Sequence, residues 1–124
     1  MILIGDVDIP FEKIQRVHSK EDIKNTQSNS IVLFDFDIEL LSYTQKNNVS
    51  SAVIIKDTLE SIYAHNLDAK YIITKKELAS KIQDLADHYL FDSKVLAIIE
   101  DKKEIEELAV AHIDGVIYSK VLGE

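Results

Sequence analysis

Acidic and basic residues follow several short apolar runs in this sequence, at positions where strands of a parallel sheet would end. All strands of a parallel sheet point the same way, so the residues that follow them meet at one edge, where α/β proteins usually bind ligands. The residues at or just past the expected strand ends are Asp6, Asp8, Asp35, Asp37, Lys56, Asp57, Thr74, Lys75, Glu100 and Asp101.

Two kinds of chemistry suit carboxylates and lysines that share one crevice. Carboxylate oxygens are ligands that Mg²⁺ prefers. An aspartate can also act as the nucleophile of phosphoryl transfer while a lysine stabilises the developing charge. Asp35 is the candidate to examine first, because it directly follows the apolar run Ile31–Phe34 and would be partly desolvated. A structural role for Asp35 stays equally open.

Helix capping is the structural alternative for the other strand-end residues. An aspartate or threonine that follows a strand commonly caps the next helix by accepting backbone N–H bonds, and its charge complements the helix dipole. Asp37, Asp57, Thr74 and Asp101 all stand where such caps belong. We therefore expect capping to account for these four.

The elements that must position these residues alternate between strand and helix. The expected strands are continuously apolar, as in parallel sheets covered on both faces, and this alternation favours an α/β domain with right-handed crossovers. The expected strands are Ile2–Gly5, Ile31–Asp35, Ala52–Ile55, Tyr71–Thr74, Val95–Ile99 and Val116–Tyr118, and a further short strand at Ile14–Val17 stays open. The expected helices are Ser19–Thr26, Ile38–Lys46, Thr58–His65, Lys76–Tyr89 and Lys102–His112.

Composition narrows the classes of partner. The chain has 124 residues, enough for one domain, and its 14 basic against 22 acidic side chains give a net charge of −8. That charge repels phosphate backbones and anionic lipid, so we expect neither nucleic acid nor membrane as a partner. Without cysteines there are no disulfides or thiolate sites. The amino terminus lacks the pattern of a secretory signal, so we expect a cytoplasmic protein.

Common catalytic motifs are missing from the sequence. It has neither glycine-rich phosphate loop, no HExxH histidine pair and no nucleophile elbow, so nucleotide binding of those kinds, zinc and a hydrolase triad have no support. Binding of a small anion at the strand ends is disfavoured by the excess of carboxylates there.

Residues 14–90 resemble the receiver domain of response regulators. The segment IQRVHSKEDIKNTQSNSIVLFD is similar to a receiver's second strand, second helix and third strand, and LDAKYIITKKELASKIQDLADHYL to its fifth strand, conserved lysine and last helix. The resemblance implies that Asp35 is the phosphoacceptor, that Lys75 is the lysine beside it, and that Asp6 and Asp8 of ILIGDVD belong to the metal-binding acidic pair, which would hold Mg²⁺ together with Asp35.

The sequence departs from the receiver pattern at several functional positions. Lys56 stands where a receiver has Ser or Thr, Lys76 replaces a proline, and the loop after Asp35 is short. The chain also continues with a strand–helix–strand over residues 94–122, which itself resembles a receiver's opening strand, acidic pair and first helix. A rearranged domain in which Glu100 and Asp101 face Asp35 stays open.

Two further families have partial likenesses to the chain. IVLFDFDIELLS is similar to the opening motif of haloacid-dehalogenase phosphatases, which implies Asp35 as nucleophile and Asp37 as general acid, although Glu39 falls near the expected Gly-Thr. LDAKYII and IDGVIY resemble βα units of TIM barrels, of which the chain has only about half the strands. A half-barrel that pairs with itself is therefore a further alternative.

These observations together predict a single flavodoxin-like α/β domain over residues 1–124. We expect a three-layer α/β/α arrangement with helices on both faces of a mostly parallel sheet of five to seven strands. Its receiver-like core would span residues 1–90. The expected function is a non-catalytic, receiver-like regulatory or protein-interaction module, with a protein partner or a second copy as its partner. The alternative is a Mg²⁺-dependent phosphoacceptor or phosphoryl-transfer domain, with Asp35 and Lys75 as its catalytic residues.

Overall fold

A computed structural model describes residues 1–123 of the chain, and seven parallel strands within that range form one sheet. The strand order along the sheet is β1-β7-β6-β5-β4-β3-β2, so every strand from β2 to β7 lies beside its neighbour in sequence. The strands are β1 (Ile2–Ile4), β2 (Ile14–Arg16), β3 (Ile31–Asp35), β4 (Ser51–Ile54), β5 (Tyr71–Lys75), β6 (Lys94–Ile99) and β7 (Gly115–Tyr118).

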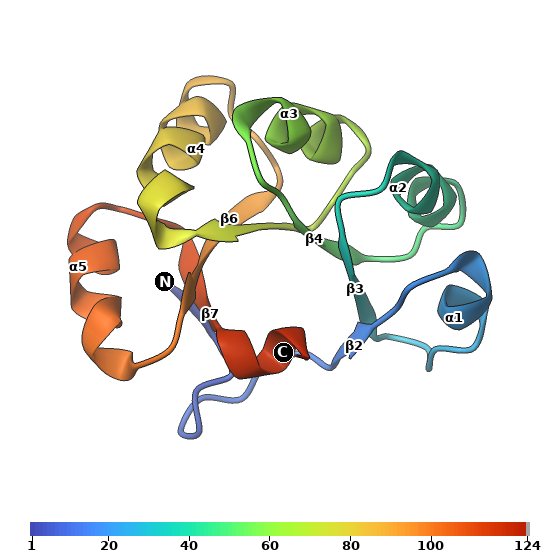
Figure 1. The fold of residues 1–124 in the computed structure, drawn as a ribbon, viewed down its shortest axis with the longest axis horizontal. Coiled ribbons are helices and arrows are strands. Elements are labelled where there is room, and N and C mark those ends of the chain that lie inside the picture. Colours follow the sequence, from blue (N-terminus) through green and yellow to red (C-terminus); the bar gives the residue numbers. More distant parts are fainter. Residues whose placement is uncertain (124) are drawn as a thin grey trace.

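Five α-helices and two 3₁₀-helices connect or follow these strands. The α-helices surround the outer face of a curled sheet, and the 3₁₀-helix that follows β7 lies on the open side of the curl (Figure 1). The helices are α1 (Lys20–Lys24), α2 (Ile38–Lys46), α3 (Thr58–Asn66), α4 (Lys76–His88) and α5 (Ile105–Val110), with 3₁₀-helices η1 (Lys102–Glu104) and η2 (Ser119–Leu122).

Each face of the sheet has its own apolar core, which explains why the strands are apolar at nearly every position. Successive side chains of a strand point to opposite faces. Phe34 of β3 and Ile72 of β5 belong to the outer core beneath the helices. Their neighbours Leu33 and Ile73 belong to the inner core, which Leu122 of η2 completes from the open side. All five side chains are at most 3% exposed.

The structure confirms an α/β domain with a parallel sheet of five to seven strands, consistent with the flavodoxin-like class. All the expected strands and helices are present, with ends that differ by a few residues. The helices are placed differently from the three-layer expectation, because all five lie on the outer face (Figure 1). The inner face is covered by curling of the sheet and by η2, so its strands are apolar on both sides without a second helical layer.

The segment from residue 5 to 13 contains no helix, and this determines where β1 lies. Because no helix connects β1 to β2, the two strands do not pair, and β1 pairs with β7 in the register Ile2↔Gly115 and Ile4↔Ile117. The strands within residues 94–122, β6 and β7, therefore extend the sheet beyond β5. β1 pairs with β7 and forms the edge of the sheet on that side. In the flavodoxin-like order 2-1-3-4-5, by contrast, the first strand lies between the second and third.

Candidate functional site

Three charged side chains from neighbouring parts of the sheet face the inner side at the carboxyl ends of the strands. Asp35 shares a face with Leu33, and Lys75 shares a face with Ile73, because alternate strand residues point the same way. By the same alternation, Arg16 shares a face with Ile14, which packs on the inner core. The candidates Asp35 and Lys75 thus lie at the same edge of the sheet, as the sequence predicts, and the structure also places them on the same face.

Asp35 is paired with Arg16. The Nη2 atom of Arg16 donates to Oδ2 of Asp35 at 3.0 Å, across the β2–β3 pair. The Arg16 side chain is 22% exposed and its Nη1 atom is buried without a partner among residues 1–123, whereas the Asp35 side chain is 71% exposed. Arg16 was not singled out from the sequence. The available signal was its position two residues after Ile14 within one run, because in a strand that spacing places the Arg16 and Ile14 side chains on the same face of the sheet.

Asp6 and Asp8 lie in the loop that follows β1, and Asp6 is bound by neighbouring groups. Its Oδ1 atom accepts the backbone N–H of Asp8 at 2.9 Å, and its Oδ2 atom accepts the Tyr118 hydroxyl at 3.1 Å. Desolvation, together with donation to Asp6, raises the pKa of Tyr118. Within residues 1–123, no three acidic or histidine side chains come close enough to hold a metal ion. The structure therefore does not bring Asp6, Asp8 and Asp35 together as one ligand group.

Three of the four expected caps are confirmed. Asp37 accepts from the N–H of Leu40 at 3.1 Å, and Asp57 accepts from the N–H of Glu60 at 2.9 Å. Asp101 caps η1 in a capping box with Glu104. These carboxylates satisfy helix amino termini, as expected from their positions.

The capping prediction for Thr74 is wrong. β5 extends one residue further than expected, so Thr74 is a strand residue and Lys75 occupies the cap position of α4. Lys75 has no acceptor in its side chain, and no side-chain hydrogen bond caps this helix. Thr74 is 1% exposed, and its hydroxyl oxygen has no hydrogen-bond partner within residues 1–123.

A cavity of about 480 Å³ lies over the ends of β4, β5 and β6. Leu122 of η2 and Leu78 of α4 contribute apolar walls, and Lys56 and Lys75 are the basic residues of the lining. The complete lining consists of Ile54, Ile55, Lys56, Thr74, Lys75, Glu77, Leu78, Ile98 and Leu122. It combines an apolar interior with a few polar groups, which is the usual character of small-molecule sites.

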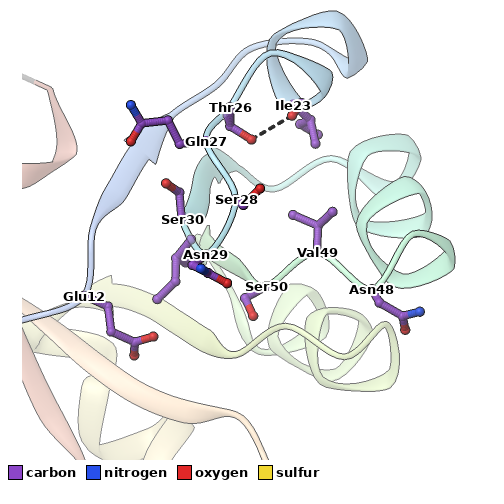
Figure 2. A pocket seen from close by; sticks show the side chains of 11 residues that line it. Glu12, Ile23, Thr26, Gln27, Ser28, Asn29, Ser30, Asn48, Val49 and Ser50 are labelled. Atoms are coloured by element: carbon purple, nitrogen blue, oxygen red, sulfur yellow. Dashed lines mark hydrogen bonds between the residues drawn. The ribbon is translucent and has the colours of Figure 1, made fainter.

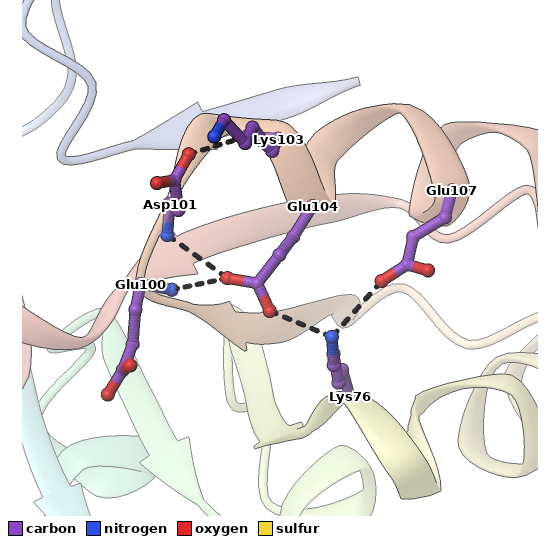
Figure 3. A network of polar contacts seen from close by, with 6 residues as sticks. All are labelled: Lys76, Glu100, Asp101, Lys103, Glu104 and Glu107. Carbon is purple, nitrogen blue, oxygen red and sulfur yellow. Dashed lines mark hydrogen bonds and ion pairs between the residues drawn. The ribbon is translucent and has the colours of Figure 1, made fainter.

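Lys76, at the start of α4, is held by two carboxylates from the next helical segment (Figure 3). Its Nζ atom lies 2.9 Å from Oε1 of Glu104 and 3.1 Å from Oε1 of Glu107. The other Glu104 oxygen accepts the backbone N–H groups of Glu100 at 2.8 Å and Asp101 at 3.0 Å. The hydrogen bond from Lys76, followed by those from the two backbone groups, lowers the pKa of Glu104 to about 2. The Glu104 and Glu107 carboxylates raise the pKa of Lys76.

A second cavity, of about 470 Å³, lies at the opposite edge of the sheet (Figure 2). Ser30 and Ser50 directly precede β3 and β4, so this cavity is at the amino ends of the strands. Its lining is mainly hydroxyl and amide groups, and Glu12 is the acidic side chain among them. These residues did not stand out in the sequence, because serine and asparagine are ordinary loop residues.

Comparisons with known proteins assign no family to the chain. A scan against protein-family models finds no match, and a search of the curated proteins finds no match either. No α-helix within residues 1–123 combines the length and apolar character needed to cross a membrane.

Proposed function

We propose that this chain is a cytoplasmic, non-catalytic regulatory or protein-interaction module. The observation that carries the proposal is the pairing of Asp35 with Arg16 at 3.0 Å. A phosphoacceptor needs its attacking carboxylate beside a metal ion that neutralises the transferred group. Here the carboxylate is paired with a guanidinium group, a cation fixed to the chain that cannot serve as an exchangeable metal.

The positions of the other candidate residues support the same proposal. Asp6 and Asp8 follow β1, which lies beyond β7 in the strand order, whereas Asp35 ends β3 near the opposite edge. Lys56 takes the place of a receiver's Ser or Thr, so the hydroxyl through which the receiver resemblance implies switching is missing. These features leave the scaffold intact while removing parts of a phosphoryl-transfer site.

A metal titration combined with a phosphorylation assay tests the proposal. Amide NMR spectra of the labelled protein are recorded with Mg²⁺ and then Mn²⁺, and intact mass is measured after incubation with acetyl phosphate and Mg²⁺. We expect no saturable shifts around Asp35 and no phosphoryl adduct. A metal-dependent adduct that the Asp35→Asn variant fails to form would contradict the proposal and support the phosphoacceptor alternative.

An apolar groove between α2 and α3 is the surface that we propose for self-association. The groove has a volume of about 390 Å³ and is lined by Ile38, Ser42, Ile62, Tyr63, Asn66 and Leu67. Ile38 and Tyr63 are 41% and 48% exposed, although apolar side chains of this size are usually buried. A groove of this kind on two copies can form an isologous contact, in which each copy contributes the same surface.

Light scattering over a range of protein concentrations tests this surface. We expect wild-type protein to dimerise and the Tyr63→Asp variant to stay monomeric, because a charge would be buried in the contact. Tyr89→Asp is the matched control, since Tyr89 is 66% exposed and lies at the end of α4, away from the groove. A monomeric wild-type protein, or equal loss of dimer in both variants, would contradict the proposed contact.

A further inference from the structure

The cavity over the ends of β4, β5 and β6 contains two lysines without an ion-pair partner in residues 1–123. Lys56 and Lys75 both line this cavity, and neither forms one of the ion pairs of the described chain. Neighbouring Lys76, in contrast, is bound by two carboxylates. Two cations at one cavity, one in the loop after β4 and one at the end of β5, form an electrostatic environment that favours an anion.

The amino terminus of α4 opens at the same cavity. This helix has 13 residues, and no side chain among residues 1–123 caps its first turn. The preceding helices α2 and α3 are each capped by an aspartate. The first backbone N–H groups of a helix have no partner within the helix, and the helix dipole favours negative charge beside them. Glu77 and Leu78, in the first turn of α4, both line the cavity.

Thr74 provides an independent indication that a ligand belongs there. It lines the cavity, is 1% exposed, and its hydroxyl oxygen is buried without a hydrogen-bond partner in the described part of the chain. A buried polar group without a partner is destabilising, so such groups are rare unless something else satisfies them. A ligand oxygen in the cavity would satisfy the Thr74 hydroxyl.

An excess of carboxylates at this edge of the sheet would repel an anion, but several of these carboxylates are already bound to cations or to backbone N–H groups. Asp35 pairs with Arg16, and Asp57 caps α3. Glu104 is bound by Lys76 and by two backbone N–H groups. Glu77 is the one carboxylate in the cavity lining, against the two lysines.

We propose that this cavity binds a small organic oxyanion, with Lys56, Lys75, the Thr74 hydroxyl and the first N–H groups of α4 around the anionic group. Ile54, Ile98 and Leu122 provide apolar walls for the body of the ligand. The inference rests on the proposed function in one respect, namely that the oxyanion regulates the module and is not converted by it. Leu122 belongs to η2, so a ligand in the cavity would also contact this 3₁₀-helix.

Binding of three simple probes tests the site and separates phosphate from carboxylate recognition. Phenyl phosphate, benzoate and the uncharged control benzyl alcohol are titrated at millimolar concentration, with amide NMR and calorimetry as readouts. We expect at least one of the two anions to give saturable shifts at Thr74–Leu78, and benzyl alcohol to bind at least about tenfold more weakly because charge-assisted hydrogen bonds are lost. Absence of saturable shifts at these residues with both anions would overturn the site.

Variants assign the binding to the named groups. Lys75→Met should raise the Kd of the bound anion about tenfold, whereas Lys46→Met, at an exposed position of α2, should leave the Kd unchanged. Thr74→Val keeps the side-chain shape, so we expect it to raise the Kd several-fold while raising the melting temperature of the free protein. Equal Kd values for wild type, Lys75→Met and Thr74→Val would overturn the site.

The failure of this inference can be distinguished from failure of the proposed function. Release of phenol from phenyl phosphate, or a phosphoryl adduct on Asp35, would contradict a non-catalytic module. Saturable shifts at Thr74–Leu78 would still support the oxyanion site in that case. Conversely, if neither anion binds in the cavity, the results of the metal titration and the acetyl phosphate assay at Asp35 still stand as the test of the proposed function.

Discussion

Replacing Glu104 with glutamine should destabilise the protein at neutral pH, and the loss should disappear in acid. The Glu104 carboxylate joins the start of α4, through Lys76, to the turn before η1, through two backbone N–H groups. Glutamine keeps the shape and one acceptor oxygen. It loses the negative charge that strengthens all three hydrogen bonds.

The size of the effect follows from the pKa of Glu104. These bonds lower that pKa from 4.5 to about 2, and a tenfold change in proton affinity corresponds to about 1.4 kcal/mol, so the upper limit is about 3 kcal/mol. The Glu104 side chain is 23% exposed and the paired Lys76 side chain 37%, so solvent screening reduces the expected loss to about 1 kcal/mol.

The direction of the pH dependence is also determined. Because the pKa is lower in the folded protein, the stabilisation by Glu104 is fully present above 4.5 and is lost as the pH falls toward about 2. Urea denaturation of wild type and Glu104→Gln should therefore show a difference in the free energy of unfolding that shrinks through this range. Other carboxylates titrate in both proteins and cancel from the difference.

Glu107→Gln is the matched control for this prediction. Glu107 contacts the same Lys76 at 3.1 Å, but its side chain is 60% exposed and it accepts no backbone N–H group. We expect its loss to change stability by less than about 0.5 kcal/mol. If the two variants were equally destabilised, or if the loss for Glu104→Gln were the same at every pH, the charge-based explanation would be refuted.

Two further predictions concern the sheet and the helix caps. Gly115→Ala should destabilise the protein by about 3 kcal/mol or more, because the new Cβ atom would lie 2.6 Å from the backbone oxygen of Ile2 and 2.8 Å from Leu96. Amide exchange should show early opening of β1, and a melting temperature equal to that of wild type would contradict this. Asp57→Ala should cost about 1 kcal/mol by removing the bond to the Glu60 N–H, whereas Asp57→Asn should retain most of it. Equal melting temperatures for Asp57→Ala and wild type would show that this cap is not stabilising.

The secondary structure could be predicted from the sequence because its signals are local. Continuous apolar runs such as Ile31–Phe34 indicate strands covered on both faces, and the segments between them have the period and length of helices. Asp37 and Asp57 were recognisable as caps because an aspartate before a helix accepts N–H groups of the next turn wherever the helix lies. Their chemistry depends on residues three positions away.

The candidate site was predictable only in part. The parallel strands predicted from the sequence placed Asp35 and Lys75 at one edge, since the carboxyl ends of parallel strands meet there, whereas the face that they share came from the structure. The pairing of Asp35 with Arg16 joins residues 19 positions apart and depends on β2 lying beside β3. The buried position of the Thr74 hydroxyl followed from the end of β5, a boundary that differs by one residue from the prediction.

Sequence alone therefore determined the class of fold, its strands and helices, and which residues lie at the carboxyl ends of the strands. Tertiary structure alone decided the strand order, the curl that leaves all α-helices on one face, and the separation of Asp6 and Asp8 from Asp35. The physical reason is that caps and alternation depend on neighbouring residues. Strand order depends instead on contacts between distant segments, such as β1 with β7, for which no short-range pattern exists.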